Sequence, residues 1–244
     1  MKKLTFLIAL LISFNLNSQK KELRQVDKLI SQSFFDEANN NLSEIQTLVL
    51  SSEDKYKADF YFFKSRVSNE LENFDEAIAS YNNLKLINSA EYSNKVKTEF
   101  ELLKDQIETS LVNSAVADNQ GEKYSEASTK LYMAYNLNKE KNQDYLYYAA
   151  GSAVNSKNYD KALLHYLELK DLNYTGIVTE YFVTNVSSGV EEKVSESEYK
   201  VFEKSKEYNN PRIGETPSRY PEIVKNIALI YVQQGKNEIA NWSN

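Results

Sequence analysis

Residues 142–173 constrain the fold more than any other stretch, because they contain two amphipathic patterns joined by a polar break at 156–158. Apolar residues of the first pattern recur at spacings of three and four, which places them on one helix face. They are Leu146, Ala149, Ala150, Ala153 and Val154. The second pattern repeats this spacing with Tyr159, Ala162, Leu163, Tyr166 and Leu167. Small residues that face large ones let two helices approach closely, so we expect an antiparallel helix pair.

A short motif, an aromatic residue three positions before an alanine, locates further copies of this pair. It occurs at Phe35/Ala38, Phe74/Ala77, Tyr124/Ala127 and Tyr159/Ala162, with a degenerate copy at Asn237/Ala240. We expect the aromatic ring to fill the turn between two helices. The alanine should lie where they cross, since a larger side chain there would push them apart. Successive alanines are 39, 50, 35 and 78 residues apart, which predicts insertions, including a long helix over 90–119.

These copies resemble the tetratricopeptide repeat (TPR), a helix-turn-helix unit of about 34 residues. The fourth copy matches the family at Leu146, Ala149, Ala150, Ala153, Ala162, Tyr166 and Leu169. Small residues occupy the family's glycine position in copies two to five, namely Ser65, Ala115, Ala150 and Ala228, whereas the family's terminal proline is absent. The resemblance implies an all-α fold, a TPR-like α-α superhelix. Repeats one to four would span 19–173, and a partial fifth would span 221–244.

Residues 174–220 interrupt the repeats, and their composition predicts a small β-hairpin insertion. The segment 175–186 is dense in β-branched and aromatic residues, 187–189 forms a turn, and 190–195 forms a return strand. A short helix capped by Ser195 or Ser197 follows over 196–208. We expect the Pro/Gly/Asn-rich stretch 209–220 to be a loop. Pro221 then begins a helix on which Ile223, Ile227 and Ile230 share one face.

Residues 1–18 have the composition of a secretory signal. Lys2 and Lys3 precede an apolar run over 4–14, and a short polar segment follows. The run would span about half of the hydrocarbon core as a helix, so it is short for a membrane span. We predict cleavage after Ser18 and export to the periplasm or cell envelope, with an uncleaved N-terminal anchor as the alternative. Together with the TPR pattern and the insertion, this signal resembles secreted TPR proteins of Bacteroidota-type bacteria.

The composition argues against several functions. The net charge of −6 and the isoelectric point of about 5.1 disfavour nucleic-acid binding. No cysteine is present, so disulfides, thiolate metal sites and cysteine nucleophiles are excluded. The single histidine, His165, lacks the serine motif of a hydrolase, and we interpret it as a surface or boundary residue. We expect no catalytic residues, no metal site, no cofactor and no transmembrane span beyond the signal.

The remaining candidate for function is the concave face, which in TPR proteins is lined by the first helix of each repeat. Counting from each motif alanine predicts the partner-binding residues Arg66, Asn69, Asn113, Tyr147, Tyr148, Lys225 and Asn226. Basic and amide groups suit a peptide carboxylate or an acidic segment, and tyrosines add flat contact area. The resemblance therefore predicts a non-catalytic scaffold that binds a protein or peptide, with the junction of repeats and insertion as the favoured site.

Three alternatives follow from the same residues. The tyrosine-rich first helices would also suit a small ligand or a glycan. Alternatively, the chain is a truncated TPR protein, since little sequence follows the helix that Pro221 begins. In that case Ile223, Ile227 and Ile230 would form an exposed apolar face, and a homodimer through this C-terminal end would cover it.

Overall fold

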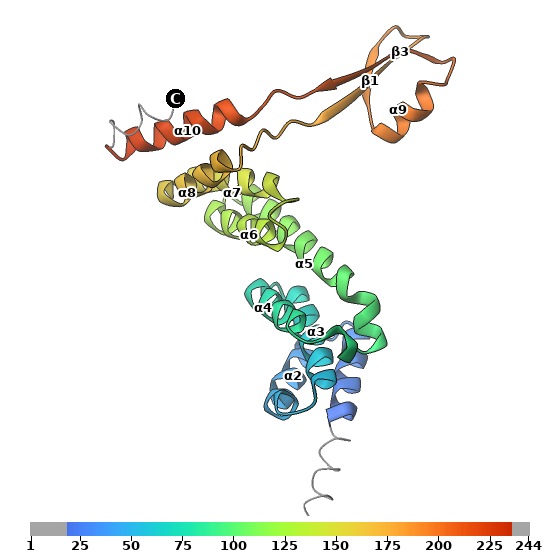
Figure 1. Cartoon of the computed structure of the whole chain (residues 1–244), viewed down its shortest axis with the longest axis vertical. Helices are drawn as coiled ribbons and strands as arrows, with labels where there is room; N and C mark the ends of the chain where they lie inside the picture. The colour runs from blue at the N-terminus through green and yellow to red at the C-terminus, as the bar shows by residue number, and fades with distance from the viewer. Residues whose placement is uncertain (1–18, 236–244) are drawn as a thin grey trace, which may run out of the picture. The chain divides into compact units, whose positions relative to one another are not determined.

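A computed structural model describes residues 19–235 of the chain (Figure 1). The described part is mostly helical, with one small antiparallel sheet near its C-terminal end. It divides into two compact units, the first ending at Gln120 and the second beginning at Gly121. The division falls between the two helices of the predicted third pair, so each unit contains one of them.

The N-terminal unit consists of helices joined by short connections. They are the helical residues 19–31, α2 (Phe35–Leu50), α3 (Asp54–Glu70), α4 (Phe74–Lys85), the short 3-10 helix η1 (Ser89–Glu91) and α5 (Asn94–Gln120). Helix α3 is central, because it packs against α2, α4 and α5. Phe62 on α3 is fully buried, although the sequence pattern did not mark it as a core residue.

Outside the insertion, the helices of the C-terminal unit are α6 (Tyr124–Leu137), α7 (Gln143–Asn155), α8 (Tyr159–Asp171) and α10 (Tyr220–Gln233). The pair predicted over 142–173 is present as α7 and α8, and Ala149, Ala150, Ala153 and Ala162 are completely buried. Helix α6 packs on α7, and α10 packs on α8 (Figure 1).

The structure contradicts the exposed apolar face that the truncation alternative implied for α10. Ile223, Ile227 and Ile230 are at most 4% exposed, because they join a core cluster with Leu146, Tyr166 and other residues of α7 and α8. Helix α10 therefore buries its isoleucine face within its own unit. Dimerisation through this end stays a prediction, but these three residues no longer support it.

The turns before the second helices share one backbone feature. Ser33, Glu72, Glu122 and Lys157 have φ between 56° and 61°, in the left-handed region that non-glycine residues seldom occupy. Each lies five residues before a motif alanine, and those alanines, Ala38, Ala77, Ala127 and Ala162, are completely buried. The recurrence in backbone and burial supports the sequence prediction that these segments are copies of one unit.

The insertion contains a three-stranded antiparallel sheet in the order β2-β1-β3. Its elements are β1 (Thr179–Asn185), β2 (Glu191–Val194), the short helix α9 (Glu196–Phe202) and β3 (Tyr208–Glu215). The predicted hairpin corresponds to β1 and β2. Ser195 caps α9 in a capping box with Glu198, as one of the two predicted caps.

The prediction of a loop over 209–220 is wrong for most of this stretch, because β3 occupies Tyr208–Glu215 and pairs with β1. Asn210 and Pro211 disfavour a regular strand, and they lie where the register shifts between Phe182 and Thr184. Asn210 has a φ of 47°, which fits such an irregularity. Pairing with β1 thus overrides the local preference for a loop.

One face of the sheet forms a small core with α9. Val183 is completely buried, and the Tyr181 and Tyr199 rings lie 5.2 Å apart. Phe202 stacks on Tyr208 at 4.1 Å between ring centres. These contacts with α9 explain how so small a sheet is stabilised, since two strands alone would be marginally stable in water.

The interpretation of His165 as a surface or boundary residue is also wrong, because its side chain is buried on α8. The imidazole stacks on Tyr132 of α6 with 4.6 Å between ring centres, and its Nε2 atom has no hydrogen-bond partner. Burial, together with the positive charge of Lys161, lowers the pKa of His165 to about 4, while Glu168 opposes this shift. The ring is therefore held in its neutral form.

We expect the stability of the C-terminal unit to depend on pH through His165. An unfolded chain protonates this histidine near pH 6.5, whereas the folded unit resists protonation down to about pH 4. Stability is thus fully present above pH 6.5 and falls as the pH drops toward 4. Urea unfolding between pH 7 and pH 4.5 should show a flatter profile for His165→Phe than for the wild type. Parallel profiles would contradict this assignment.

Candidate functional site

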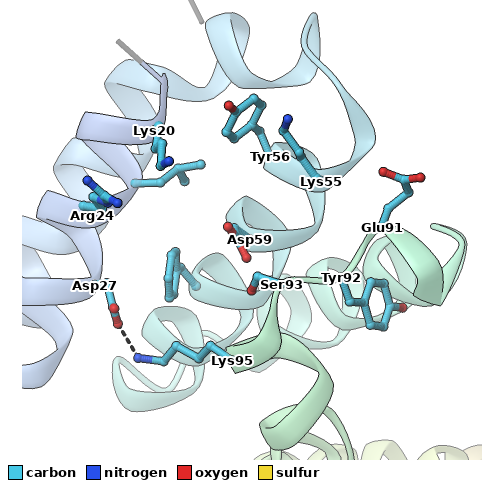
Figure 2. A pocket seen from close by; sticks show the side chains of 12 residues that line it. Lys20, Arg24, Asp27, Lys55, Tyr56, Asp59, Glu91, Tyr92, Ser93 and Lys95 are labelled. Atoms are coloured by element: carbon cyan, nitrogen blue, oxygen red, sulfur yellow. Dashed lines mark hydrogen bonds and ion pairs between the residues drawn. The ribbon is translucent and has the colours of Figure 1, made fainter. Parts of the chain in front are cut away.

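An open cavity of about 500 Å³ lies in the N-terminal unit, between residues 19–31, α3, η1 and the start of α5 (Figure 2). Volumes of this size are typical of ligand sites. Apart from the single turn of η1, the helices at its walls are residues 19–31, α3 and α5. They are the first helices of the three predicted pairs that begin in this unit. Its walls include the buried side chains of Leu23, Phe63 and Tyr92.

Charged side chains of both signs line this cavity. The cations are Lys20, Arg24, Lys55 and Lys95, and the carboxylates are Asp27, Asp59 and Glu91. Lys95 forms an ion pair with Asp27, drawn as a dashed line in Figure 2, and Lys55 lies 2.8 Å from Glu53. Within residues 19–235, neither Lys20 nor Arg24 forms an ion pair, and the same holds for the carboxylates Asp59 and Glu91 of this cavity.

Helix geometry explains how α3 contributes to this cavity. Tyr56, Asp59 and Phe63 follow one another at spacings of three and four, so they lie on one face of the helix. Figure 2 shows Asp59 between the helix that carries Arg24 and the segment that carries Ser93. Burial raises the pKa of the Asp59 carboxyl, while a hydrogen bond from Ser93 and the charge of Lys95 act in the opposite direction.

The predicted site residues of the N-terminal unit lie elsewhere on its helices. Arg66 forms an ion pair of 2.9 Å with Glu99 of α5. Asn69 is buried and donates a hydrogen bond of 3.0 Å to Ser110 Oγ, also on α5. The polar groups of Arg66 and Asn69 thus connect α3 to α5, whereas Asn113 is exposed on α5.

In the C-terminal unit, two predicted tyrosines surround an arginine that the sequence interpretation missed. The Arg219 guanidinium carbon lies 4.4 Å from the centre of the Tyr147 ring and 5.3 Å from that of Tyr148. The Arg219 side chain also donates a hydrogen bond of 3.3 Å to the Tyr148 hydroxyl. The Tyr147 hydroxyl donates to Glu222 Oε2 at 2.9 Å, and this bond joins α7 to α10.

The backbone positions Arg219 at this junction. Its N–H donates to the Thr175 carbonyl at 2.7 Å, so the chain entering α10 is tied to the chain leaving α8. Gly176 has a φ of 55°, and a Cβ atom there would lie 2.6 Å from the Tyr174 hydroxyl and 2.8 Å from Arg219 Cδ. Only glycine fits this close approach. The one sequence signal for Arg219 was its place just before the helix that Pro221 begins.

The other two predicted residues of this unit differ in their surroundings. Asn226 donates a hydrogen bond of 3.0 Å to the Tyr166 hydroxyl and so contributes to packing of α10 on α8. Lys225 is exposed, and Tyr148 is 47% exposed in spite of its contact with Arg219. Tyr148 and Lys225 are therefore the predicted residues of this unit that remain accessible to a partner.

A second cavity of the N-terminal unit, of about 460 Å³, is lined by aromatic and basic side chains. Its lining includes the rings of Tyr92 and Phe100 and the side chains of Lys85 and Lys97. The Phe100 ring also stacks on Tyr81, with 5.3 Å between the ring centres.

Among the helices of residues 19–235, none has both the length and the hydropathy needed to cross a membrane. The same residues contain no group of three or more histidine or acidic side chains placed to hold a metal ion.

Comparisons with known proteins identify no family. No family model matches the chain, and no curated protein matches it. Among solved structures, it is similar to the crystal structure of BtubC (BKLC) from P. vanneervenii, with 11% sequence identity and a TM-score of 0.35. The similarity covers 95% of this chain and 86% of that one. At this TM-score and identity, the similarity supports no conclusion about function.

Proposed function

We propose that the chain is an exported, non-catalytic scaffold of TPR type, which binds a protein or peptide through the first helices of its helix pairs. The single observation that carries this proposal is the cavity between residues 19–31, α3 and α5. Its walls come mainly from the helices that line the binding face in TPR proteins. The left-handed turns five residues before buried alanines support the repeat interpretation, although no family model matches.

The charges of the cavity favour a partner segment with acidic groups. Lys20 and Arg24 form no ion pair among residues 19–235, and a carboxylate of a bound peptide would neutralise them through charge-assisted hydrogen bonds. The whole chain carries a net charge of −6, so an acidic segment should bind where cations gather locally, as Lys20 and Arg24 do here. On the C-terminal unit, the exposed Tyr148 and Lys225 would provide similar contacts.

Selection from a displayed library of random peptides tests this function without a known partner. We expect enriched peptides to bind the wild type and to bind Lys20→Glu/Arg24→Glu at least about tenfold more weakly. The control is Lys21→Glu/Lys28→Glu, which makes the same charge change at exposed positions of the same helix, outside the cavity. No enrichment, or an equal loss in both variants, would contradict binding at the cavity.

Export has its own test. The chain should be recovered from the periplasmic or surface fraction of a bacterial host, and N-terminal sequencing should begin at Gln19. Recovery of the full-length chain from the membrane fraction would favour the uncleaved anchor.

A small ligand or glycan remains the second candidate, and the aromatic cavity next to Phe100 favours it, since sugars pack on aromatic rings. Thermal-shift screening against a sugar panel would test it, with Phe100→Ala as the variant that should lose any shift.

A further inference from the structure

Asp59 and Glu91 are the carboxylates of the large cavity that form no ion pair among residues 19–235, and of the two only Asp59 is shielded from solvent in part. It is half-buried on α3, and within residues 19–235 it has no ion-pair partner. Figure 2 shows it between the helix of Lys20 and Arg24 and the segment of Ser93. A carboxylate withdrawn from water without a partner is unfavourable, so a ligand that supplies a positive charge would gain free energy there.

Two of the four cations that line the cavity with Asp59 already form ion pairs with other residues. Lys95 pairs with Asp27, and Lys55 pairs with Glu53 outside the cavity. The hydrogen bond from Ser93 satisfies part of the carboxylate but brings no charge. Lys20 and Arg24 line the same cavity, but among residues 19–235 neither forms an ion pair with Asp59, so a cation of a bound ligand can still pair with this carboxylate.

Two aromatic side chains line the cavity on the same face of α3 as this carboxylate, and each already has a lysine ammonium near its ring. Lys55 lies 4.8 Å from the Tyr56 ring centre, and Lys95 lies 5.8 Å from that of Phe63. Tyr56 precedes Asp59 by three positions and Phe63 follows it by four, and both line the cavity with it. Rings on the same helix face as a carboxylate suit a ligand with an apolar stem and a charged end, since the stem contacts the rings while the end reaches the carboxylate.

We propose that this cavity binds a lysine side chain of an extended partner segment, with its ammonium group on Asp59 and its methylene stem against Tyr56 and Phe63. The inference rests on the proposed function and specifies its partner. Lys20 and Arg24 of the same cavity, which form no ion pair among residues 19–235, favour acidic residues on either side of that lysine. The recognised segment is thus a lysine between acidic residues.

Binding of a defined peptide to the full mature chain tests the inference. The probe is acetyl-Glu-Ala-Lys-Ala-Glu-amide, whose blocked ends leave the lysine as its only positive charge, measured by calorimetry. The second probe carries Nε-acetyl-lysine at the same place. We expect the acetylated probe to bind at least about tenfold more weakly, because it keeps the stem and loses the charge.

The matched variants are Asp59→Asn and Asp54→Asn, which remove one negative charge each from the same helix. Asp54 is exposed, pairs with Lys57 and does not line the cavity. We expect Asp59→Asn to weaken binding of the lysine probe at least about tenfold, and Asp54→Asn to leave it nearly unchanged. Asp59→Asn should also melt at a higher temperature than the wild type, because the folded state loses a poorly compensated buried charge. A loss of binding in that variant is then not a loss of folding.

The outcomes separate this inference from the proposed function. Equal binding of both probes, unchanged binding to Asp59→Asn, or no binding of the lysine probe would overturn the lysine site. If library selection still enriches lysine-free peptides that depend on Lys20 and Arg24, the proposed function stands and only the lysine inference fails. A free amino terminus is distinguished by a lysine-free probe with an unblocked end, whose tighter binding would also overturn the inference.

Discussion

Replacing Ile227 by alanine is expected to lower the free energy of unfolding of the C-terminal unit by about 2–5 kcal/mol. Ile227 is completely buried on α10, in one core cluster with Leu146, Tyr166 and Leu169 of α7 and α8. Truncation to alanine removes buried methyl groups and leaves a cavity that rigid helix neighbours fill only in part. Since α10 contacts the other helices through its isoleucine face, the variant should also loosen α10 itself.

Leu229→Ala is the matched control for Ile227→Ala. It lies on the same helix and is 54% exposed, so its replacement should change the unfolding free energy by less than about 0.5 kcal/mol. Urea unfolding gives the two energies, and hydrogen exchange should show faster exchange over α10 and α8 only for Ile227→Ala. Similar effects of both variants would mean that α10 is not docked through this face.

The paired helices could be predicted from the sequence because their signals are local. Periodic apolar residues mark the faces of α7 and α8, and the alanine of each motif marks where two helices cross. Ala38, Ala77, Ala127 and Ala162 are completely buried, as alanines at close contacts between helices would be.

Features that depend on distant contacts escaped prediction. The stretch containing Asn210 and Pro211 has loop composition, and it becomes β3 only because β1 offers an edge for pairing. Burial of His165 depends on Tyr132, which lies on a different helix. The same holds for the isoleucine face of α10, whose covering helices lie far back in the chain.

Only the residue types of the candidate site could be predicted from the sequence. A basic and aromatic binding face was expected, and tyrosines 147 and 148 do lie next to an arginine, Arg219, contributed from a distant part of the chain. Asp59 carries no sequence signal, because it is one of 35 acidic residues and only the fold leaves it without a counter-ion. Lys20 and Arg24 lie on the first helix, whereas all of the predicted partner-binding residues come from later helices.

The second large effect is expected at Ala77, where leucine should destabilise the N-terminal unit by about 1–3 kcal/mol. Ala77 is completely buried on α4, and Ser65 Oγ of α3 donates to its carbonyl at 2.8 Å. Backbone and small side chains are in close contact at this crossing, so three added carbons must displace α4 from α3. Such a displacement would also weaken the contact of both helices with α5.

Ala79→Leu provides the comparison, since Ala79 lies two residues further along the same helix and is exposed. Leucine and alanine have similar helix propensities, so the substitution at Ala79 should be nearly neutral, and the difference between the variants measures overpacking at the crossing alone. Thermal and urea unfolding of the two proteins would give this difference. If Ala77→Leu were as stable as Ala79→Leu, close packing could not be the reason for alanine at this position. The spacing of the motif alanines would then lose its physical basis as a repeat signal.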